Sequence, residues 1–374
     1  MHVPCIACCQ AAGAFNVRLT DRRRKGDDPH SWASSEEATV ANHNGWGLIG
    51  TGRIADDRIL PAINAYAGNK LVGVVSRDPQ RAQQFAQKFG AQHAYTDYEA
   101  MLRNPAVTVV AIHTPNALHA EQAIAAARAG KHVFCDKPMA TSVADAERIV
   151  SACDRAGVKL GINFHNRFMQ CFIDAQQSIA SGEIGEVLVV QIEASPGARP
   201  GGRLGTWRLD PGVAGLGTTY SIGVHIYDIL RYMLSSEVQT VSAFFDTPRG
   251  IMEETNLSTL RFANGALVQV NINEKAPNPH NDFVIYGSKG RITGRGVTRS
   301  RASGELEVLT NDGKSRRTEY PVSNAHEACV INFSKALLEG RDPSPSGIDG
   351  LRSVQLTEAM ARSAWDGVHV RLAY

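Results

Sequence analysis

The sequence predicts an α/β protein with a doubly wound parallel sheet, followed by an α+β domain with a largely antiparallel open sheet. Three observations indicate this fold class. An apolar run over 46–49 breaks into a Gly-x-Gly-x-x-Ala turn at 50–55 and continues as a helix. Patterns of buried strands and amphipathic helices then alternate up to about residue 166. Beyond that point, two-sided alternation and turn dipeptides replace the regular pattern.

The glycine-rich turn has the residue spacing of a dinucleotide pyrophosphate site, although ordinary glycine-rich loops often have the same pattern. Gly50 lets the chain turn tightly out of the strand, and Gly52 removes a side chain that would hold the backbone away from the phosphates. Ala55 lets the helix pack closely on the strand. The helix then points its free N–H groups and the positive end of its dipole at the pyrophosphate. The predicted cofactor contacts are Gly50, Thr51, Gly52, Arg53 and Ile54.

The segments after this turn fit parallel strands joined by crossover helices. Predicted strands cover 70–75, 107–112, 132–135 and 159–163, and predicted helices cover 79–89, 117–129 and 142–156. Gly90, Gly130 and Gly157 follow these helices as end signals, and Ser142 with Asp145 is a capping-box pattern. This succession predicts a Rossmann domain.

The second half of the chain has the pattern of an antiparallel sheet with helices. Predicted strands cover 187–193, 257–262, 266–272, 282–286 and 305–309, and predicted helices cover 223–234, 324–338 and 348–364. Asn264-Gly265 favours a type I′ hairpin between two of these strands. Such a sheet can pack one face on helices and offer the other to a partner subunit.

Composition limits the function classes. With 374 residues, the chain is long enough for two domains with their own cores. Its 39 Lys and Arg residues and 37 Asp and Glu residues leave a net charge of +2, which indicates neither a nucleic-acid nor a membrane surface. No apolar segment approaches the length of a membrane span. Seven cysteines without a regular framework predict a reducing compartment, so we expect a cytoplasmic protein.

The first 44 residues stand apart from this pattern. Cys5, Cys8 and Cys9 lie close together without a second CxxC pair, so we expect no metal site there. The three arginines at 22–24 lack the apolar stretch that a twin-arginine export signal needs. We expect residues 1–44 to be a disordered tail or a misplaced start, residues 45–166 to bind NAD(P), and residues 167–374 to form the second domain.

Further motifs follow along both domains. A Thr-Pro-Asn-x-x-His turn covers 114–119, and an Asp-Lys-Pro turn covers 136–138. Later come Trp-Arg-Leu-Asp-Pro at 207–211, Gly-Leu-Gly at 215–217, Gly-Val-His at 223–225 and Tyr-Gly-Ser-Lys-Gly at 286–290. Through these motifs the chain resembles the glucose-fructose oxidoreductase, inositol dehydrogenase and MocA family from Trp46 to the C-terminus.

The resemblance implies an NAD(P)-dependent oxidoreductase that moves a hydride between nicotinamide and a secondary alcohol or ketone of a sugar, polyol or cyclitol. It implies that residues 167–374 bind the substrate, partly through the loop 194–203, and form a homodimer or homotetramer through their sheet. The implied cofactor contacts in the later motifs are Thr114, Pro115, Asn116, His119, Asp136, Lys137, Trp207 and Arg208.

Lys137 and His225 are the catalytic residues that the resemblance implies. An ammonium group beside the substrate oxygen can donate a hydrogen bond to it, stabilise alkoxide charge and take part in proton transfer. An imidazole titrates near neutral pH, which suits exchange of the hydroxyl proton. The structural alternatives are an ordinary exposed lysine and a core histidine.

One position departs from the family pattern. The family commonly has Asp-x-Gly-x-His where this chain has Ser221-x-Gly-x-His225. Ser221 can hydrogen-bond a hydroxyl but carries no charge to raise the basicity of the histidine. Either Lys137 and His225 suffice, with help from Tyr220, or turnover has been lost and the protein is a dinucleotide-binding sensor or corepressor. The expected substrate-binding residues are His165, Arg167, Tyr220, Ser221 and His225.

The end of the second predicted strand indicates the cofactor. An acid directly after that strand would accept hydrogen bonds from both ribose hydroxyls and repel a 2′-phosphate. This chain has Ser76 and Arg77 there, a hydroxyl and a guanidinium that can hold a phosphate. The pattern favours NADP over NAD. Asp78 follows directly and Arg77 could instead stack on adenine, so the use of both cofactors stays open.

Overall fold

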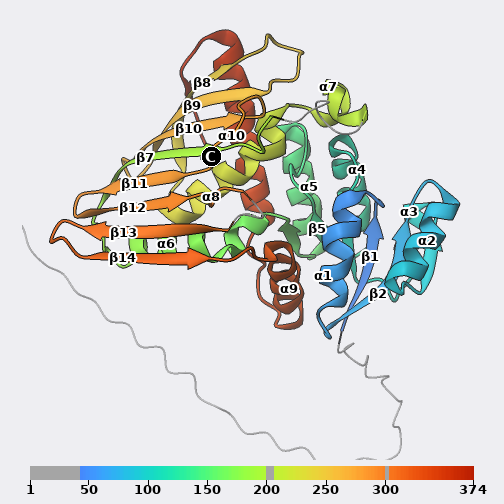
Figure 1. The fold of residues 1–374 in the computed structure, drawn as a ribbon. Helices are drawn as coiled ribbons and strands as arrows, with labels where there is room; N and C mark the ends of the chain where they lie inside the picture. Colours follow the sequence, from blue (N-terminus) through green and yellow to red (C-terminus); the bar gives the residue numbers. More distant parts are fainter. Residues whose placement is uncertain (1–42, 199–205, 300–302) are drawn as a thin grey trace, which may run out of the picture. The chain divides into compact units, whose positions relative to one another are not determined.

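The computed structural model describes residues 43–198, 206–299 and 303–374, and its first sheet has six parallel strands in the order β3-β2-β1-β4-β5-β6 (Figure 1). The strands are β1 (Asn44–Ile49), β2 (Asn69–Val75), β3 (His93–Tyr95), β4 (Val109–Ile112), β5 (His132–Cys135) and β6 (Leu160–Ile162). The order reverses between β1 and β4, as in a Rossmann domain. The predicted doubly wound sheet is confirmed.

Helices connect these strands. They are η1 (Ala55–Ile59, a π-helical turn), α1 (Leu60–Asn64), α2 (Pro79–Phe89), α3 (Tyr98–Leu102), η2 (Asn116–Leu118), α4 (His119–Arg128) and α5 (Val143–Ala156). The helix predicted over 79–89 is confirmed, and Gly90 follows it with a φ of 72°. At α5, the Asp145 N–H donates to the Ser142 hydroxyl oxygen at 3.1 Å, which is one half of the predicted capping box, and the Asp145 carboxylate accepts from the Ser142 hydroxyl at 3.0 Å.

The second sheet has nine strands in the order β14-β13-β12-β11-β7-β10-β9-β8-β15. They are β7 (Val187–Ala194), β8 (Val238–Phe245), β9 (Thr255–Phe262), β10 (Leu267–Asn273), β11 (Phe283–Gly287), β12 (Gly290–Arg295), β13 (Gly304–Thr310), β14 (Ser315–Tyr320) and β15 (Val370–Arg371). Within the described strands, β7 and β10 pair in parallel and every other pair is antiparallel. The predicted α+β domain is confirmed.

The turn between β9 and β10 differs from the prediction. Gly265 N donates to Phe262 O at 3.0 Å, so the central residues of the turn are Ala263 and Asn264. Gly265 follows them with a φ of 92°, which is the left-handed residue of a three-residue hairpin loop. A type I′ turn would instead place both Asn264 and Gly265 at the centre. Phe262, which precedes this loop, is fully buried.

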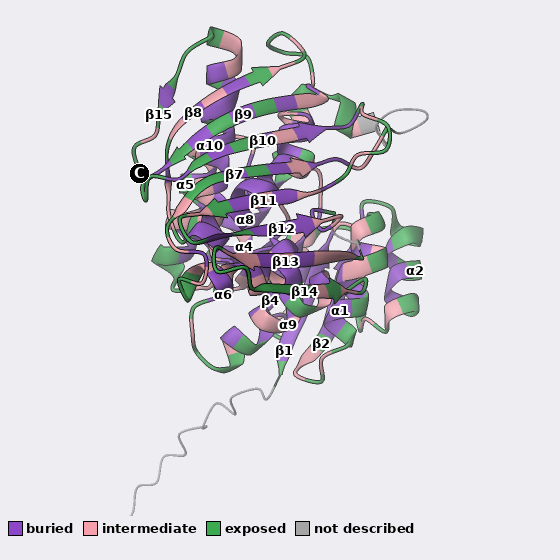
Figure 2. Ribbon diagram, turned by 60° about the vertical axis from the view of Figure 1, so that its left-hand side comes forward, coloured by how far each residue is buried: buried purple, intermediate pink, exposed green. Residues whose placement is uncertain are grey.

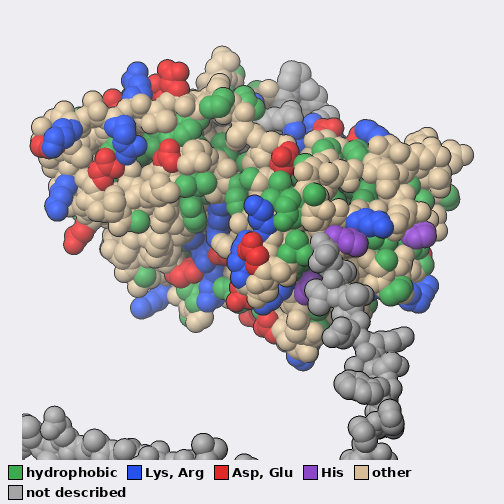
Figure 3. Space-filling view, turned by 90° about the horizontal axis from the view of Figure 1, so that it is seen from below, with side chains coloured by type: hydrophobic (Ala, Val, Ile, Leu, Met, Phe, Trp, Pro, Cys, Tyr) green, Lys and Arg blue, Asp and Glu red, His purple; other side chains and the backbone are tan. Residues whose placement is uncertain are grey.

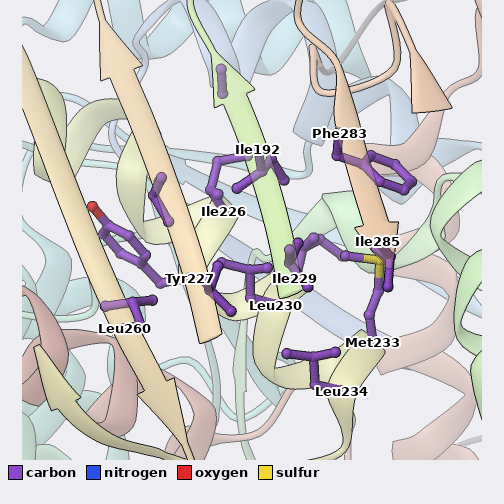
Figure 4. Packing of buried hydrophobic residues seen from close by; sticks show 14 of the residues in the cluster. Ile192, Ile226, Tyr227, Ile229, Leu230, Met233, Leu234, Leu260, Phe283 and Ile285 are labelled. Atoms are coloured by element: carbon purple, nitrogen blue, oxygen red, sulfur yellow. The ribbon is translucent and has the colours of Figure 1, made fainter. Parts of the chain in front are cut away.

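Helices cover one face of the second sheet. The elements of this half are η3 (His165–Phe168), α6 (Gln170–Ala180), η4 (Thr206–Leu209), α7 (Pro211–Ala214), η5 (Thr219–Gly223), α8 (Val224–Leu234), α9 (Ala325–Leu338) and α10 (Gly347–Asp366). Figure 4 shows side chains of α8, among them Ile226, Leu230 and Met233, packed against Ile192 of β7 and Ile285 of β11. The strands alternate between buried and exposed residues, so the opposite face is open to solvent (Figure 2).

Helix α9 packs against the first sheet although it follows the second sheet in the chain. The Phe333 ring lies 6.0 Å from Trp46 and 5.2 Å from Phe134, measured between ring centroids. A Cβ atom at Gly161 would come within 2.4 Å of the Phe333 ring, so this glycine makes room for the aromatic side chain. The chain thus returns from the second sheet to complete the first core. The division at residues 166 and 167 stays a prediction.

No helix in the described part of the chain is long and apolar enough to cross a membrane. On the face shown in Figure 3, basic and acidic side chains are interspersed. Residues 1–42, including Cys5, Cys8, Cys9 and the arginines at 22–24, lie outside the described residues. The same holds for 199–203 of the predicted specificity loop.

Candidate functional site

The glycine-rich turn leaves β1 at the edge where the parallel strands end. Gly50 has a φ of 101°, and a Cβ atom there would lie 2.5 Å from the His113 carbonyl oxygen. At Gly52, by contrast, a Cβ atom would meet no described atom within 4 Å. The backbone at Gly52 is therefore open to a ligand, and the helical segment begins directly after it. Arg53 is exposed and Ile54 half-buried beside this opening, whereas Ala55 is fully buried.

The end of β2 is joined to this turn by side chains. Thr51 Oγ1 donates to Ser76 Oγ at 3.1 Å, and Arg81 Nε lies 3.0 Å from both Thr51 O and Thr51 Oγ1. Arg77 is exposed. Asp78 caps α2, because its Oδ1 accepts hydrogen bonds from the Gln80 and Arg81 N–H groups at 2.9 and 3.3 Å. Arg81 was not predicted from the sequence, although it lies four residues after Arg77, in the first turn of α2.

The Thr-Pro-Asn turn follows β4 and contacts the second half of the chain. Thr114 Oγ1 donates to Gln122 Oε1 at 2.7 Å, and Asn116 Nδ2 donates to Ala214 O at 2.8 Å. Thr114, Pro115 and Asn116 are half-buried and remain accessible to a ligand.

His119 does not have the predicted place beside a cofactor. It is fully buried, and its two ring nitrogens lie 2.8 Å from Pro138 O and 2.9 Å from Thr114 O. The ring therefore connects the turn after β4 to the turn after β5 and presents no surface to a ligand. This corrects the expectation from the motif.

Asp136 and Lys137 follow β5. The Asp136 carboxylate accepts hydrogen bonds from Lys137 N at 2.9 Å and Asn163 Nδ2 at 3.2 Å, and its Oδ2 lies 3.5 Å from His113 Nδ1. Burial raises the pKa of Asp136, but His113 and Lys137 outweigh it and hold that pKa below its usual range. Asp136 is therefore ionised. Lys137 Nζ donates to the Ser221 carbonyl oxygen at 2.8 Å, which links this turn to η5.

Three histidines from different elements surround Lys137. The His165 ring of η3 lies 4.6 Å from His225 of α8 and stacks at 3.6 Å on His326 of α9. Burial lowers the pKa of His225 well below its usual range, and the Lys137 ammonium lowers it further. Burial also lowers the pKa of His326 to about 2, with His165 contributing. The three rings are therefore neutral near pH 7. His326 was not predicted from the sequence.

The charge on Lys137 is balanced by groups from several elements. Burial lowers the pKa of Lys137, Asp136 raises it, Arg208 lowers it and Glu274 raises it. The Arg208 guanidinium lies 4.2 Å from the centroid of the half-buried Trp207 ring. The Arg208 guanidinium therefore packs on the Trp207 ring, close enough to Lys137 to lower its pKa.

Arg167 and Tyr220 also differ from their predicted roles. The Arg167 guanidinium forms two hydrogen bonds to Asp228, at 2.8 and 2.6 Å, and an ion pair with Asp349 at 2.8 Å, with 9% of its side chain exposed. Tyr220 is buried, and its hydroxyl donates to Thr141 O at 3.2 Å. Both side chains connect elements inside the protein. Neither is available to bind a substrate in this arrangement.

Two carboxylates that sequence reasoning missed support η5. Buried Glu253 accepts hydrogen bonds from the Gly217 and Thr219 N–H groups, both at 2.8 Å, and so holds the glycine-rich turn at 215–217. Glu274, directly after β10, accepts a hydrogen bond from the exposed Ser221 hydroxyl at 2.9 Å. Neither glutamate belongs to a motif that the sequence displays, so long-range contacts alone reveal them.

Comparisons with known proteins agree over most of the chain. The Gfo/Idh/MocA family, described as an oxidoreductase family with an NAD-binding Rossmann fold, matches residues 45–164. The GFO/IDH/MocA C-terminal domain matches residues 172–293.

Individual relatives match almost over their full lengths. The 1,5-anhydro-D-fructose reductase of Ensifer adhaerens is 31% identical, covering 87% of this chain and 97% of the relative. Myo-inositol 2-dehydrogenase of Thermotoga maritima is 28% identical, with 87% and 98% covered. Among solved structures, a levoglucosan dehydrogenase in complex with NADH and levoglucosan has 27% sequence identity and a TM-score of 0.80. The match covers 88% of this chain and 99% of that one.

The interior ion pairs of Arg167 predict a structural effect. We expect Arg167→Met to lower the free energy of unfolding by about 3–5 kcal/mol, because Asp228 would lose its partner in the interior. Arg148→Met is the matched control, since its pair with Asp145 is on the surface and should contribute about 0–1 kcal/mol. Urea unfolding followed by circular dichroism measures both. Unchanged stability together with a raised substrate KM would contradict this assignment.

Proposed function

The chain belongs to the glucose-fructose oxidoreductase, inositol dehydrogenase and MocA family of oxidoreductases, and we propose that it transfers a hydride between a nicotinamide dinucleotide and a secondary alcohol or ketone of a sugar, polyol or cyclitol. The observation that carries the proposal is the placement of Lys137 Nζ at 2.8 Å from Ser221 O, at the edge where the parallel strands end. His225 is close enough to Lys137 for the ammonium to lower its pKa.

The residues around the glycine-rich turn suit a dinucleotide. The open position at Gly52 leaves room for a pyrophosphate against the backbone, and the N–H groups at the start of the helix would bind it. Thr114, Pro115 and Asn116 would contact the nicotinamide half, and Asp136 the adjoining ribose. Trp207 and Arg208 would cover the cofactor or substrate from the second half of the chain. When bound, the dinucleotide supplies or accepts the hydride.

The side chains of this chain would handle the proton. Protonated Lys137 would donate a hydrogen bond from Nζ to the substrate oxygen and stabilise negative charge that develops on it. Neutral His225 would accept the hydroxyl proton at a ring nitrogen when the alcohol is oxidised and return it in the reverse direction. Burial keeps the His225 ring neutral, so one ring nitrogen is unprotonated and can accept this proton. Ser221 would border the substrate, and buried His165 would contact the His225 ring from behind.

The sensor or corepressor alternative depends on the missing aspartate at position 221. Glu274 Oε1 lies 2.9 Å from Ser221 Oγ and places a carboxylate beside that position from the residue after β10. This contact favours turnover over a purely regulatory role.

The groups at the end of β2 favour NADP. Ser76 and the exposed Arg77 lie where a 2′-phosphate would be bound, and Arg81 adds a second guanidinium beside Thr51. Asp78 is engaged as the N-cap of α2, so its carboxylate is directed to the helix and away from the ribose. We propose NADP as the preferred cofactor, with NAD as a weaker one.

The open face of the second sheet suits a subunit contact. Val189, Leu257, Leu267 and Tyr286 are each 38–47% exposed, and Phe244 is 75% exposed. Strand pairing places Phe244 opposite Leu257, and Val189 between Leu267 and Tyr286. An apolar sheet face of this kind favours burial against a second copy. We propose a homodimer or homotetramer through this face. The described cysteines, Cys135, Cys153, Cys171 and Cys329, are buried free thiols, as a reducing compartment would allow.

Lys137→Ala tests the proposed function. Nicotinamide absorbance would be followed with NADP and NAD against a panel of sugars, inositols and their keto forms. We expect turnover to fall by about 10²–10⁴-fold while dinucleotide affinity, measured by fluorescence titration, stays nearly unchanged. Lys314→Ala, on the exposed β13–β14 turn, is the matched control. Loss of dinucleotide binding in place of turnover would refute the role of Lys137, and absence of turnover in the wild type would support the sensor alternative.

Arg77→Ala tests the cofactor preference. We expect the KM for NADP to rise about 10–100-fold with little change for NAD, because a charge-assisted hydrogen bond to the phosphate is lost. Arg103→Ala, at an exposed arginine on the same domain, serves as the control. An equal loss for both cofactors would instead indicate that Arg77 stacks on adenine.

Leu267→Arg tests the subunit contact. Leu267 lies between Val189 of β7 and Arg261 of β9, so a second guanidinium at this position should repel the first and convert the assembly to monomers. Light scattering after gel filtration measures the mass. Val322→Arg, at an exposed residue before α9, should leave the mass unchanged. If wild-type protein is a monomer, or if Leu267→Arg retains the wild-type mass, the proposed interface is wrong.

A further inference from the structure

Ser221 connects Lys137 to Glu274 through its backbone and its side chain. Lys137 Nζ donates to the Ser221 carbonyl oxygen at 2.8 Å, and Ser221 Oγ donates to Glu274 Oε1 at 2.9 Å. The first contact crosses 84 residues of sequence and the second crosses 53. One short segment of η5 therefore connects an ammonium group from the first domain to a carboxylate from the second sheet.

Glu274 is held firmly where it can serve this role. It follows β10 directly, and its N–H donates to Glu254 O at 2.8 Å, so the β9–β10 ladder fixes its backbone. Glu274 is 8% exposed. A carboxylate this far from solvent requires compensating hydrogen bonds or positive charge, and Ser221 and Lys137 both contribute here.

We propose that Glu274 is a positioning residue for Lys137 and supplies, through Ser221, the carboxylate that family members commonly carry at position 221. The proposal rests on the proposed function of Lys137. Glu274 would fix the Ser221 segment that accepts the hydrogen bond from Nζ, and its negative charge would favour the protonated form of the amine. The position of the carboxylate would thus have moved from η5 to the end of β10.

Several charged or titratable groups face Lys137 from the surrounding elements. Asp136 precedes it in the same turn, Arg208 approaches from η4, and Glu274 from the end of β10. His165, His225 and His326 approach from η3, α8 and α9, and all three have lowered pKa values. Because the histidines are neutral, the pKa of Lys137 is raised by the carboxylates of Asp136 and Glu274 and lowered by burial and by Arg208. Removing the Glu274 carboxylate should lower the pKa of Lys137, although by less than removing Asp136 would.

Glu274→Gln tests this inference with a readout that does not require turnover. The variant keeps the volume and an amide oxygen for Ser221 but removes the charge. Competitive acetylation of lysines over a range of pH, read by mass spectrometry, gives the midpoint at which Lys137 loses its proton. We expect the midpoint to fall to lower pH. Glu254→Gln is the matched control, because Glu254 pairs with Lys275 at the surface. An unchanged Lys137 midpoint in folded Glu274→Gln protein would overturn the proposal.

The pH profile of turnover gives the second measurement. Lys137 acts while protonated, so activity is lost as pH rises through its pKa, and Glu274→Gln should move this alkaline limb to lower pH by the same amount. The double variant Ser221→Asp with Glu274→Gln restores a carboxylate beside Lys137 and should return the limb toward the wild-type position. If the limb stays at the position of the single variant, Glu274 does not replace the aspartate. If the wild type shows no turnover, the proposed function fails while acetylation still decides the role of Glu274.

Discussion

The parallel pairing of β1 with β4, and of β4 with β5, is the constraint on which the site depends. Because these strands run the same way, their carboxyl ends meet at one edge of the sheet, and the glycine-rich, Thr-Pro-Asn and Asp-Lys-Pro turns leave the sheet there. The approach is close, since a Cβ atom at Gly50 would lie 2.5 Å from the carbonyl oxygen of His113 after β4. His119 then holds the second and third turns together by contacting Pro138 O and Thr114 O.

The electrostatics of this edge follow from burial. Removing an ammonium group from water disfavours its charged form, and nearby carboxylates oppose that effect. At Lys137 these are Asp136, from its own turn, and Glu274, from the second sheet. Burial, and to a lesser extent the same ammonium, lowers the pKa of His225 and keeps the resting ring neutral. A protonated amine and an uncharged ring can therefore lie side by side, which is the combination that hydride transfer to or from a carbinol requires.

The site is assembled from both halves of the chain, because α9 returns to the first sheet after the second sheet is complete. Phe333 of α9 packs against both Trp46 and Phe134, and the same helix brings His326 onto His165. At a second junction, Arg167 pairs with Asp228 of α8 and Asp349 of α10. Core packing and interior ion pairs thus set the position of groups that surround Lys137. A substitution at either junction would act on the site through structure.

The sequence by itself determined the parallel sheet except for its short edge strand β3, most of its helices and the turns that carry Gly52, Thr114 and Lys137, because strand alternation, helix caps and glycine turns depend on neighbouring residues. It did not indicate polar strands such as β14, whose sequence SRRTEY has no apolar alternation. Tertiary structure alone decided the interior roles of His119, Arg167 and Tyr220 and revealed Glu274, His326 and Arg81 beside predicted residues. Their partners lie far away in the chain, and only folding determines which charges and hydrogen-bonding groups meet.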